Sequence, residues 1–206
     1  MNNSPSAGLD EKLIDRDPIR QFQSWLNEAL EAGIPLADAM TLATATPDGR
    51  PSARMVLLKQ VDQDGFVFYT NYRSPKARQM DANPYASLVF YWPQLERQVR
   101  VEGSVVRTSE QESREYFQTR PRESQIGAWA SEQSEVISGR EVLEQRASEL
   151  EGLYCDREID CPEYWGGYRL KPDRIEFWRG RVGRLHDRIL YQRDSGGAWS
   201  ISRLAP

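Results

Sequence analysis

The single histidine of this 206-residue chain lies in the segment Arg184-Leu185-His186-Asp187-Arg188. The flanking residues are rich in β-branched and aromatic side chains, which is typical of a hairpin strand. Alternate side chains of a strand share a face, so Arg184, His186 and Arg188 are predicted to point one way and Leu185 and Asp187 the other. Three potential cations on one face repel each other unless an anion lies among them. The alternative is a solvated strand face whose charges are screened by salt.

A second basic segment, residues 54–59, reads RMVLLK. Its apolar interior predicts a strand, with a basic residue near each end. The basic residues either reach into a binding site or mark strand ends near solvent. On a strand the two faces are Arg54, Val56 and Leu58 on one side and Met55, Leu57 and Lys59 on the other.

A third cluster joins a strand to a helix. The strand end Tyr69-Thr70-Asn71 runs into Ser74-Pro75-Lys76, where Ser74 is a good N-cap and proline suits the first helical position. Free backbone N–H groups and the helix dipole make such a helix start an anion site. The alternative is an ordinary N-cap beside a solvated lysine.

The fourth cluster is residues 116–129, YFQTRPRESQIGAW. Tyr116 and Arg120 are four residues apart and share a helix face, and Ser124 follows the turn at Pro121. A tyrosine hydroxyl, a guanidinium and a serine hydroxyl that converge can hold a phosphate, which arginine binds bidentately. Taken singly, Tyr116 is more often a residue at the edge of a core and Ser124 more often a cap.

The elements that must position these residues follow from the periodicity. Four helices are predicted. The first follows the N-cap Asp17 and ends at Gly33, and the second covers 74–83. The third runs from Ser109 to Pro121, and the fourth from a capping box at Ser138 to Leu153. Residues alternate with a period of two in the predicted strands. These strands are 40–46, 52–60, 66–71, 85–92, 95–107, 165–170, 175–178 and 198–203, besides the segment around His186.

Most of these strands follow one another without an intervening helix, which predicts an antiparallel sheet and favours a barrel. The chain has no GxGxxG and no GxxxxGK[ST] motif, so neither common phosphate-loop class applies. The predicted fold class is mainly β with peripheral helices (α+β). Residues 1–16 are predicted to be a mobile tail, and residues 17–206 a single domain.

Composition narrows the protein class. Hydrophobic residues make up 39% and charged residues 28%, and the net charge of −4 does not suggest nucleic-acid binding. The sequence has no apolar run of bilayer length and no signal-peptide pattern, so we expect a soluble, cytoplasmic protein. Cys155 and Cys161, with one histidine, are too few for a usual zinc site, and no metal is predicted. A short disulfide between them is conceivable, but two reduced thiols fit that compartment better.

Together the segments RMVLLK, FYTN, LERQV, RPRESQIGAW, EQS, YWGG, IEFW and RLHDR, in this order from Asp17 onward, resemble the pyridoxine/pyridoxamine 5′-phosphate oxidase family. The resemblance implies an antiparallel Greek-key split β-barrel. It also implies a homodimer that binds FMN in two clefts between the subunits.

Carried over by motif, the resemblance implies a cofactor site and a substrate site. In one subunit the cofactor site comprises Arg54, Met55, Val56, Leu57, Leu58, Lys59, Tyr69, Thr70 and Lys76. The second subunit adds Gln98, Gln133, Ser134, Trp178 and Arg188. The substrate phosphate is assigned to Lys59, Tyr116, Arg120 and Ser124, while Arg184 and His186 cover the pyridine ring as the catalytic pair.

Two features depart from the family pattern. Pro75 stands where the family usually has an arginine, which implies weaker binding of the FMN phosphate or partial replacement by Arg73. The tail reads LDEKLID at residues 9–15 and lacks the Arg-Arg-x-Tyr segment that covers the substrate in some members, so no such residues are assigned here.

The implied reaction oxidises pyridoxine or pyridoxamine 5′-phosphate to pyridoxal 5′-phosphate by hydride transfer to FMN, with O₂ giving hydrogen peroxide. A phenazine-pathway FMN oxidase is the alternative within the fold, but that branch lacks the grip formed here by Lys59 and Arg120-Pro121-Arg122. A non-catalytic flavin-binding barrel is the alternative of another class. It would not need Tyr116, Arg120, Ser124 and Arg184 together.

Overall fold

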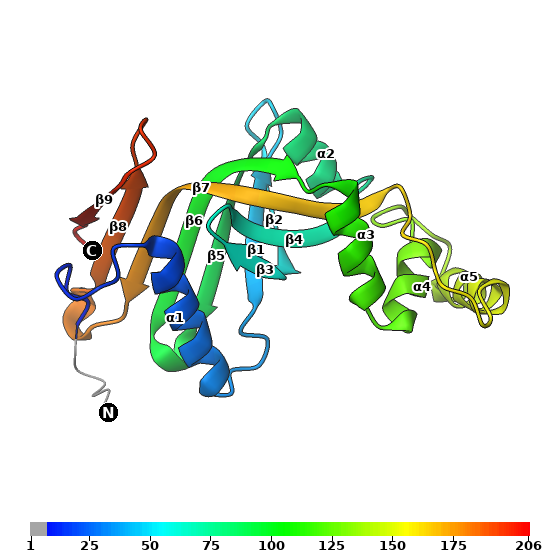
Figure 1. The fold of residues 1–206 in the computed structure, drawn as a ribbon, viewed down its shortest axis with the longest axis horizontal. Coiled ribbons are helices and arrows are strands. Elements are labelled where there is room, and N and C mark those ends of the chain that lie inside the picture. The colour runs from blue at the N-terminus through cyan, green and yellow to red at the C-terminus, as the bar shows by residue number, and fades with distance from the viewer. Residues whose placement is uncertain (1–7) are drawn as a thin grey trace.

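The computed structural model describes residues 8–206. Its longest axis runs from the β8–β9 hairpin at one end to helices α4 and α5 at the other, with the barrel between them (Figure 1). The helices are α1 (Pro18–Glu31), α2 (Pro75–Ala82), α3 (Glu110–Thr119), α4 (Arg122–Ala130) and α5 (Arg140–Leu153), with short 3₁₀ turns η1 (Pro93–Leu95) and η2 (Val182–Arg184). The strands are β1 (Ala39–Ala45), β2 (Pro51–Leu57), β3 (Gln60–Asp62), β4 (Gly65–Asn71), β5 (Tyr85–Trp92), β6 (Arg97–Arg107), β7 (Trp165–Arg179), β8 (Asp187–Arg193) and β9 (Trp199–Arg203).

Within the described residues these strands form one nine-stranded sheet in the order β2-β1-β5-β6-β7-β4-β3, and β8 and β9 branch from β7. All the pairings are antiparallel. One edge of β7 pairs with β6, while the other pairs first with β4 and then with β8. Pro172, which has no N–H to donate, lies between these two stretches. The sheet therefore divides along β7, and the predicted split barrel is confirmed.

The sequence explains the strands and the first helix directly. β1 and β6 alternate between buried and less buried residues, as expected for strands with one face on the core. β4, reading GFVFYTN, is buried on both faces and is accordingly almost continuously apolar. The Asp17 carboxylate accepts the backbone N–H of Ile19 at 2.8 Å, and Pro18 opens α1 as predicted.

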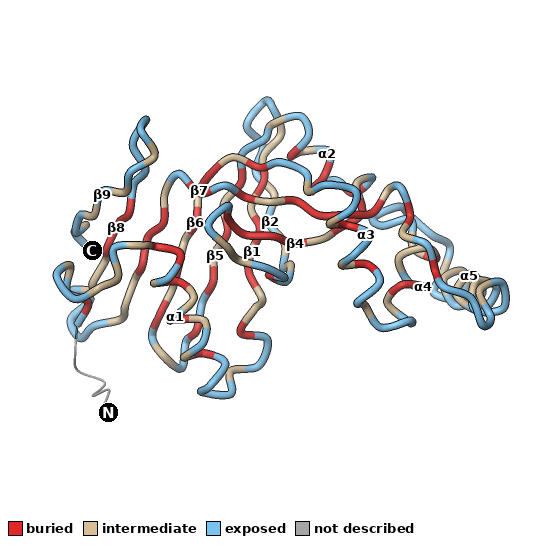
Figure 2. The backbone as a smooth tube through the Cα atoms, in the orientation of Figure 1, coloured by how far each residue is buried: buried red, intermediate tan, exposed pale blue. Residues whose placement is uncertain are grey.

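The main core lies inside the barrel under α1, where the tube of Figure 2 is buried along the central strands. Phe22 of α1 packs edge-on against Phe66, with ring centroids 4.9 Å apart, and 4.7 Å from Phe90. A smaller core lies beneath α3 and α4. Its buried members are Phe117, Ile126, Ile159 and Trp165.

Residues 8–16 were predicted to belong to a mobile tail with little to bury, and in the structure they pack against β8 and β9. Leu9 is 9% exposed and its backbone N–H donates to Asp187, while Arg203 donates to the Leu9 carbonyl and pairs with Glu11 at 2.7 Å. The carbonyl of Asp15 accepts the hydroxyl of Tyr191 at 2.6 Å. Residues 1–7 lie outside the described part of the chain.

Four local predictions were wrong. The strands expected at 165–170 and 175–178 are one strand, β7, and the strand expected to reach residue 60 ends at Leu57. Ser138 does not cap α5; Gly139 holds that position without a side-chain hydrogen bond. Helix α4, which was not predicted, begins directly after Pro121, because a proline that ends one helix can also precede the first turn of the next.

In residues 8–206 no helix is both long enough and apolar enough to span a bilayer. Cys155 and Cys161 are both free thiols, the first exposed and the second half-buried.

The packing of α1 makes a testable prediction. Phe22 is fully buried, so Phe22→Ala should lower the free energy of unfolding by about 3–5 kcal/mol through lost burial and a cavity. Leu30 on the same helix is 55% exposed, and Leu30→Ala should change the free energy of unfolding by less than about 0.5 kcal/mol. Chemical denaturation at one fixed protein concentration measures both. Equal losses in the two variants would show that α1 does not pack as described.

Candidate functional site

A cleft of about 500 Å³ opens between β2, β4 and the helices α2, α3 and α4. It brings together eleven of the residues that the sequence assigned to the two sites, and no Asp or Glu is among the described residues that line it. The assigned residues are Met55, Val56, Leu57, Lys59, Tyr69, Thr70, Lys76, Tyr116, Arg120, Ser124 and Gln133. A size of this order suits a small organic ligand.

Lys76 lines this cleft and is only 9% exposed. Its ammonium group donates to the hydroxyls of Thr70 at 3.2 Å and Ser74 at 3.3 Å, and to the side-chain carbonyl of Gln133 at 3.1 Å. All three acceptors are neutral. Burial, with a smaller effect from the nearby Arg54, lowers the pKa of Lys76 to about 8. An anion placed here would stabilise the charged form and raise this pKa again.

Arg54 lies near Lys76 but does not line the cleft. Its guanidinium donates to the carbonyl of Leu42 at 3.1 Å and to the hydroxyl of Thr44 at 2.7 Å. Burial lowers its pKa, since these partners bring no negative charge. Leu58, also assigned to the cofactor, lies one residue past the end of β2 and is buried in the main core instead.

Arg120 occupies the α3–α4 side of the cleft. Its guanidinium carbon lies 4.6 Å from the ring centre of Trp165, and its buried Nη1 has no hydrogen-bond partner within the described chain. Burial lowers the pKa of Arg120. The rings of Tyr69 and Tyr116 stack at 3.9 Å, and Trp165 continues that stack at 5.4 Å from Tyr69. A buried donor without a partner costs free energy until an acceptor binds.

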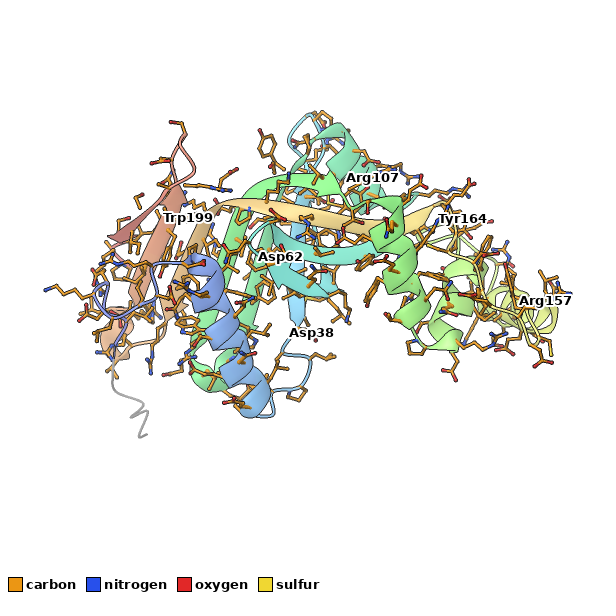
Figure 3. All side chains as sticks on the ribbon, in the orientation of Figure 1. Asp38, Asp62, Arg107, Arg157, Tyr164 and Trp199 are labelled. Atoms are coloured by element: carbon orange, nitrogen blue, oxygen red, sulfur yellow. The ribbon has the colours of Figure 1, made fainter. Side chains whose placement is uncertain are left out.

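Lys59 forms the rim of the cleft. Its ammonium group lies 3.3 Å from a carboxylate oxygen of Asp38, which is labelled in Figure 3. Ser124 lies on the first turn of α4, between Arg120 and the cleft-lining Gly127. The helix that places Ser124 was missed from the sequence, but the serine itself was predicted to face this site, and it does.

The segment around His186 is organised differently from the prediction. Arg184 ends the 3₁₀ turn η2 with φ +61°, and β8 starts only at Asp187. Arg184, His186 and Arg188 therefore do not share the face of one strand, because the left-handed backbone at Gly183 and Arg184 interrupts it. His186 Nδ1 accepts the backbone N–H of Arg181 at 3.1 Å.

The same end of the sheet holds three other residues assigned to the cofactor. Trp178 pairs in register with Gln98 on one side and with Arg188 on the other, and its ring lies 4.7 Å from that of His186. Arg188 makes two hydrogen bonds to the buried carboxylate of Glu176, at 2.8 and 3.1 Å. This arrangement raises the pKa of Arg188 and fixes its orientation.

The two groups of assigned residues lie at opposite ends of β7. Trp165, its first residue, lines the cleft, whereas Trp178 adjoins His186 near its last residue. Thirteen residues of strand span roughly 40 Å along the chain. One chain therefore cannot bring Arg184 and His186 to its own cleft, and a second copy must supply them if they act there.

Gln133 corrects the predicted division between subunits. It was assigned to the second chain, yet it contacts Lys76 and Thr70 of its own chain. Ser134 beside it has φ +76° and does not line the cleft. Arg73, expected to replace the cation lost at Pro75, points away from the cleft, and its guanidinium lies over the ring of Tyr164 at 4.5 Å.

Four lining residues were not assigned to any site from the sequence: Gly127, Ala128, Ser131 and Trp165. A fifth, Asn71, was named in the predicted anion site but given no ligand. The YWGG segment carried a usable signal for Trp165. A Cβ at Gly167 would come within 2.9 Å of the Tyr69 ring and closer still to Thr108, so this glycine lets Tyr69 lie against β7.

Comparison with known proteins identifies the family. A family model described as "Pyridoxamine 5'-phosphate oxidase" matches residues 26–154, and one described as "Pyridoxine 5'-phosphate oxidase C-terminal dimerisation region" matches residues 165–206. A protein from Rubrobacter xylanophilus is 60% identical over 97% of this chain and 92% of its own length. The chain belongs to the pyridoxamine 5′-phosphate oxidase family.

Other relatives agree with this assignment. The Rubrobacter protein and one from Nostoc punctiforme, 55% identical over 97% of this chain and 93% of its own, are both named pyridoxine/pyridoxamine 5′-phosphate oxidase. The chain is accordingly an FMN-dependent oxidoreductase, and its match to the dimerisation region supports a homodimer.

Solved structures share the fold. PhzG from Burkholderia lata 383, in complex with tetrahydrophenazine-1-carboxylic acid, is 33% identical with a TM-score of 0.91 and covers 98% of both chains. An FMN-binding protein from Nostoc punctiforme, described as pyridoxamine 5′-phosphate oxidase-related, is 20% identical with a TM-score of 0.74. It covers 92% of this chain and 98% of its own, and supports the fold alone.

The residues present fit FMN. Its phosphate is a dianion, and the cleft offers a buried ammonium held by neutral groups, with a second cation near it. The stacked rings of Tyr69, Tyr116 and Trp165 line the same cleft, as does the apolar segment Met55–Leu57. The donor set therefore matches a planar, phosphate-bearing ligand.

The pKa of Lys76 makes the second prediction. If FMN phosphate binds beside Lys76, binding favours the protonated lysine. The affinity of the apoprotein should then fall as the pH rises from about 7 to about 9, by at most about tenfold per unit. Flavin fluorescence quenching measures it. Riboflavin, which lacks the phosphate, and the Lys76→Met variant should both give flat profiles. An FMN affinity independent of pH in this range would contradict the assignment.

Proposed function

We propose that this protein oxidises pyridoxine 5′-phosphate and pyridoxamine 5′-phosphate to pyridoxal 5′-phosphate. The alcohol loses two electrons and two protons, which reduce O₂ to hydrogen peroxide. The amine also loses two electrons and two protons, which gives an imine, and hydrolysis of the imine by water releases ammonia and the aldehyde. The proposal agrees with the printed names of relatives that are 55–60% identical over nearly the whole chain.

One observation carries this proposal: the cleft is lined by more cations than one phosphate needs. Lys76 lies among neutral acceptors with Arg54 nearby. Arg120, whose Nη1 has no partner among the described residues, lines the same cleft with Lys59 and the hydroxyls of Tyr116 and Ser124. A single cofactor phosphate would use Lys76. Arg120 then suits the phosphate of a second ligand.

In this proposal the chain's residues bind and orient the substrate. Lys59, Arg120 and the two hydroxyls hold its phosphate. Arg184 and His186 of the second subunit cover its ring, which keeps C4′ against the flavin, and such positioning supplies much of the rate. When bound, FMN supplies the redox chemistry, as a hydride acceptor that O₂ reoxidises.

His186 acts here as a hydrogen-bond donor. Its Nδ1 accepts the N–H of Arg181 at 3.1 Å, so in the neutral ring the proton is on Nε2. Nε2–H can then donate to a substituent of the substrate ring. The contact fixes the orientation of the imidazole, and no obligatory base is assigned.

The PhzG structure favours one alternative, an oxidase of phenazine precursors, because it shares the fold over the whole chain. Its identity of 33% is well below that of the two relatives named for the vitamin phosphates. The ligand of that structure carries a carboxylate, which offers two oxygens where a phosphate offers three, so it would use fewer of the donors of Lys59, Tyr116, Arg120 and Ser124. A non-catalytic flavin carrier would have no use for the additional cations.

The deciding experiment is an oxidase assay on the FMN-loaded protein with each vitamin phosphate. We expect pyridoxal 5′-phosphate and hydrogen peroxide to form in equal amounts as O₂ is consumed. Unphosphorylated pyridoxine should react poorly, since it lacks the group that Arg120 binds. A flavin-loaded preparation that yields no aldehyde from either phosphate would overturn the proposed function.

The two phosphate sites can be separated by mutation. Arg120→Ala should raise KM for either substrate by roughly ten- to a hundredfold, because it removes a hydrogen bond between charged groups. It should leave FMN content unchanged. The matched control is Arg122→Ala. The sequence placed Arg122 in the phosphate grip with Arg120, but it does not line the cleft and donates instead to the carbonyls of Tyr154 and Arg157. Steady-state kinetics and the flavin absorbance of the purified variants report both effects. Loss of flavin in the first variant would mean that the two sites are exchanged.

A further inference from the structure

The guanidinium of Arg54 is held by neutral acceptors. Besides the Leu42 carbonyl and the Thr44 hydroxyl, its Nη2 lies 3.5 Å from the side-chain carbonyl of Gln79. Among residues 8–206 no carboxylate pairs with either Arg54 or Lys76, and burial lowers the pKa of both. Two positive charges therefore remain uncompensated at this end of the cleft.

Gln79 connects this arginine to helix α2. Its Oε1 accepts the hydroxyl of Thr44 at 2.5 Å as well as the Arg54 N–H, and its Nε2 donates to the hydroxyl of Ser52 at 3.2 Å. Because every polar atom of the amide has a partner of matching character, its orientation is fixed. Gln79 is three residues after Lys76 on α2, so one helix face carries both the lysine and the group that orients the arginine.

Because the Gln79 side chain is neutral, it orients Arg54 without reducing the positive charge of Arg54. A carboxylate in its place would also be accommodated, since Thr44 and Ser52 can both donate to it. It would, however, pair with Arg54 and offset the positive charge that this arginine adds next to Lys76. Pro75 already removes one cation that the family resemblance led us to expect here, so Arg54 and Lys76 are the cations that remain.

We propose that Gln79 is a positioning residue for the cofactor phosphate, which orients Arg54 through neutral hydrogen bonds so that its full charge, with that of Lys76, is available to the phosphate. This inference rests on the proposed placement of the FMN phosphate at Arg54 and Lys76. It assigns Gln79 a role in affinity for the phosphate group alone, without contact to the flavin ring or the substrate.

The test is Gln79→Glu, which keeps the size and the hydrogen bonds of the side chain but adds a charge. The apoprotein should bind FMN roughly ten- to a hundredfold more weakly, the range expected when a charged contact is lost. Its affinity for riboflavin, which lacks the phosphate, should be unchanged. The melting temperature of the apoprotein should be equal or higher, because the new carboxylate pairs with Arg54. Fluorescence quenching titrations and thermal unfolding measure these quantities.

Two further variants separate the possible failures. Gln145→Glu adds the same charge on the exposed face of α5 and should leave FMN affinity unchanged. Arg54→Gln should weaken FMN binding but not riboflavin binding. If Arg54→Gln does so and Gln79→Glu does not, the role of Gln79 is refuted while the placement stands. If neither variant affects FMN, the placement itself fails. Equal weakening of FMN and riboflavin by Gln79→Glu would refute the inference, because that would indicate general damage to the cleft.

Discussion

The central physical constraint in this structure is desolvated positive charge without a counter-ion. Lys76 is almost fully buried, Arg54 is half-buried near it, and one N–H of Arg120 is buried without a partner. A buried charge that lacks an opposite charge typically costs several kcal/mol. Within residues 8–206, Lys76 and Arg54 are held by hydroxyls, a side-chain amide and a backbone carbonyl, so a bound anion would supply the negative charge that these residues do not. Ligand binding and the stability of the folded chain are therefore coupled.

The fold places this cleft by means of β7. The first half of the strand pairs with β4 and brings Trp165 beside Tyr69, while the second half pairs with β8 and carries Trp178 beside His186. β6 runs along the other edge for nearly the whole length and keeps the two halves in one sheet (Figure 1). A rigid strand of this length fixes the distance between the cleft and the His186 segment.

The sequence predicted most of the sheet because hydrophobic alternation is a local signal. It predicted the cleft residues because long motifs carry the resemblance to a family whose binding residues could be transferred. The failures have non-local or backbone causes. Nothing in the RLHDR pattern indicates that Gly183 and Arg184 adopt left-handed backbone angles, which end the expected strand. The polar segment 8–16 becomes ordered through Arg203, which lies 192 residues from Glu11. Gln79 is a neutral residue within a helix, and the sequence does not show that it contacts Thr44, Ser52 and Arg54 on the neighbouring strands.

The length of β7 also affects how mutations combine in a dimer. On the proposed assignment, each of the two clefts takes its phosphate-binding residues from one chain and Arg184 and His186 from the other. A chain defective at Arg120 and a chain defective at His186 would then form a mixed dimer with one intact cleft and one cleft that carries both defects. A chain with a single defect would impair one cleft in a dimer with a normal partner and leave the other intact, so activity would fall only in proportion to the share of the defective chain.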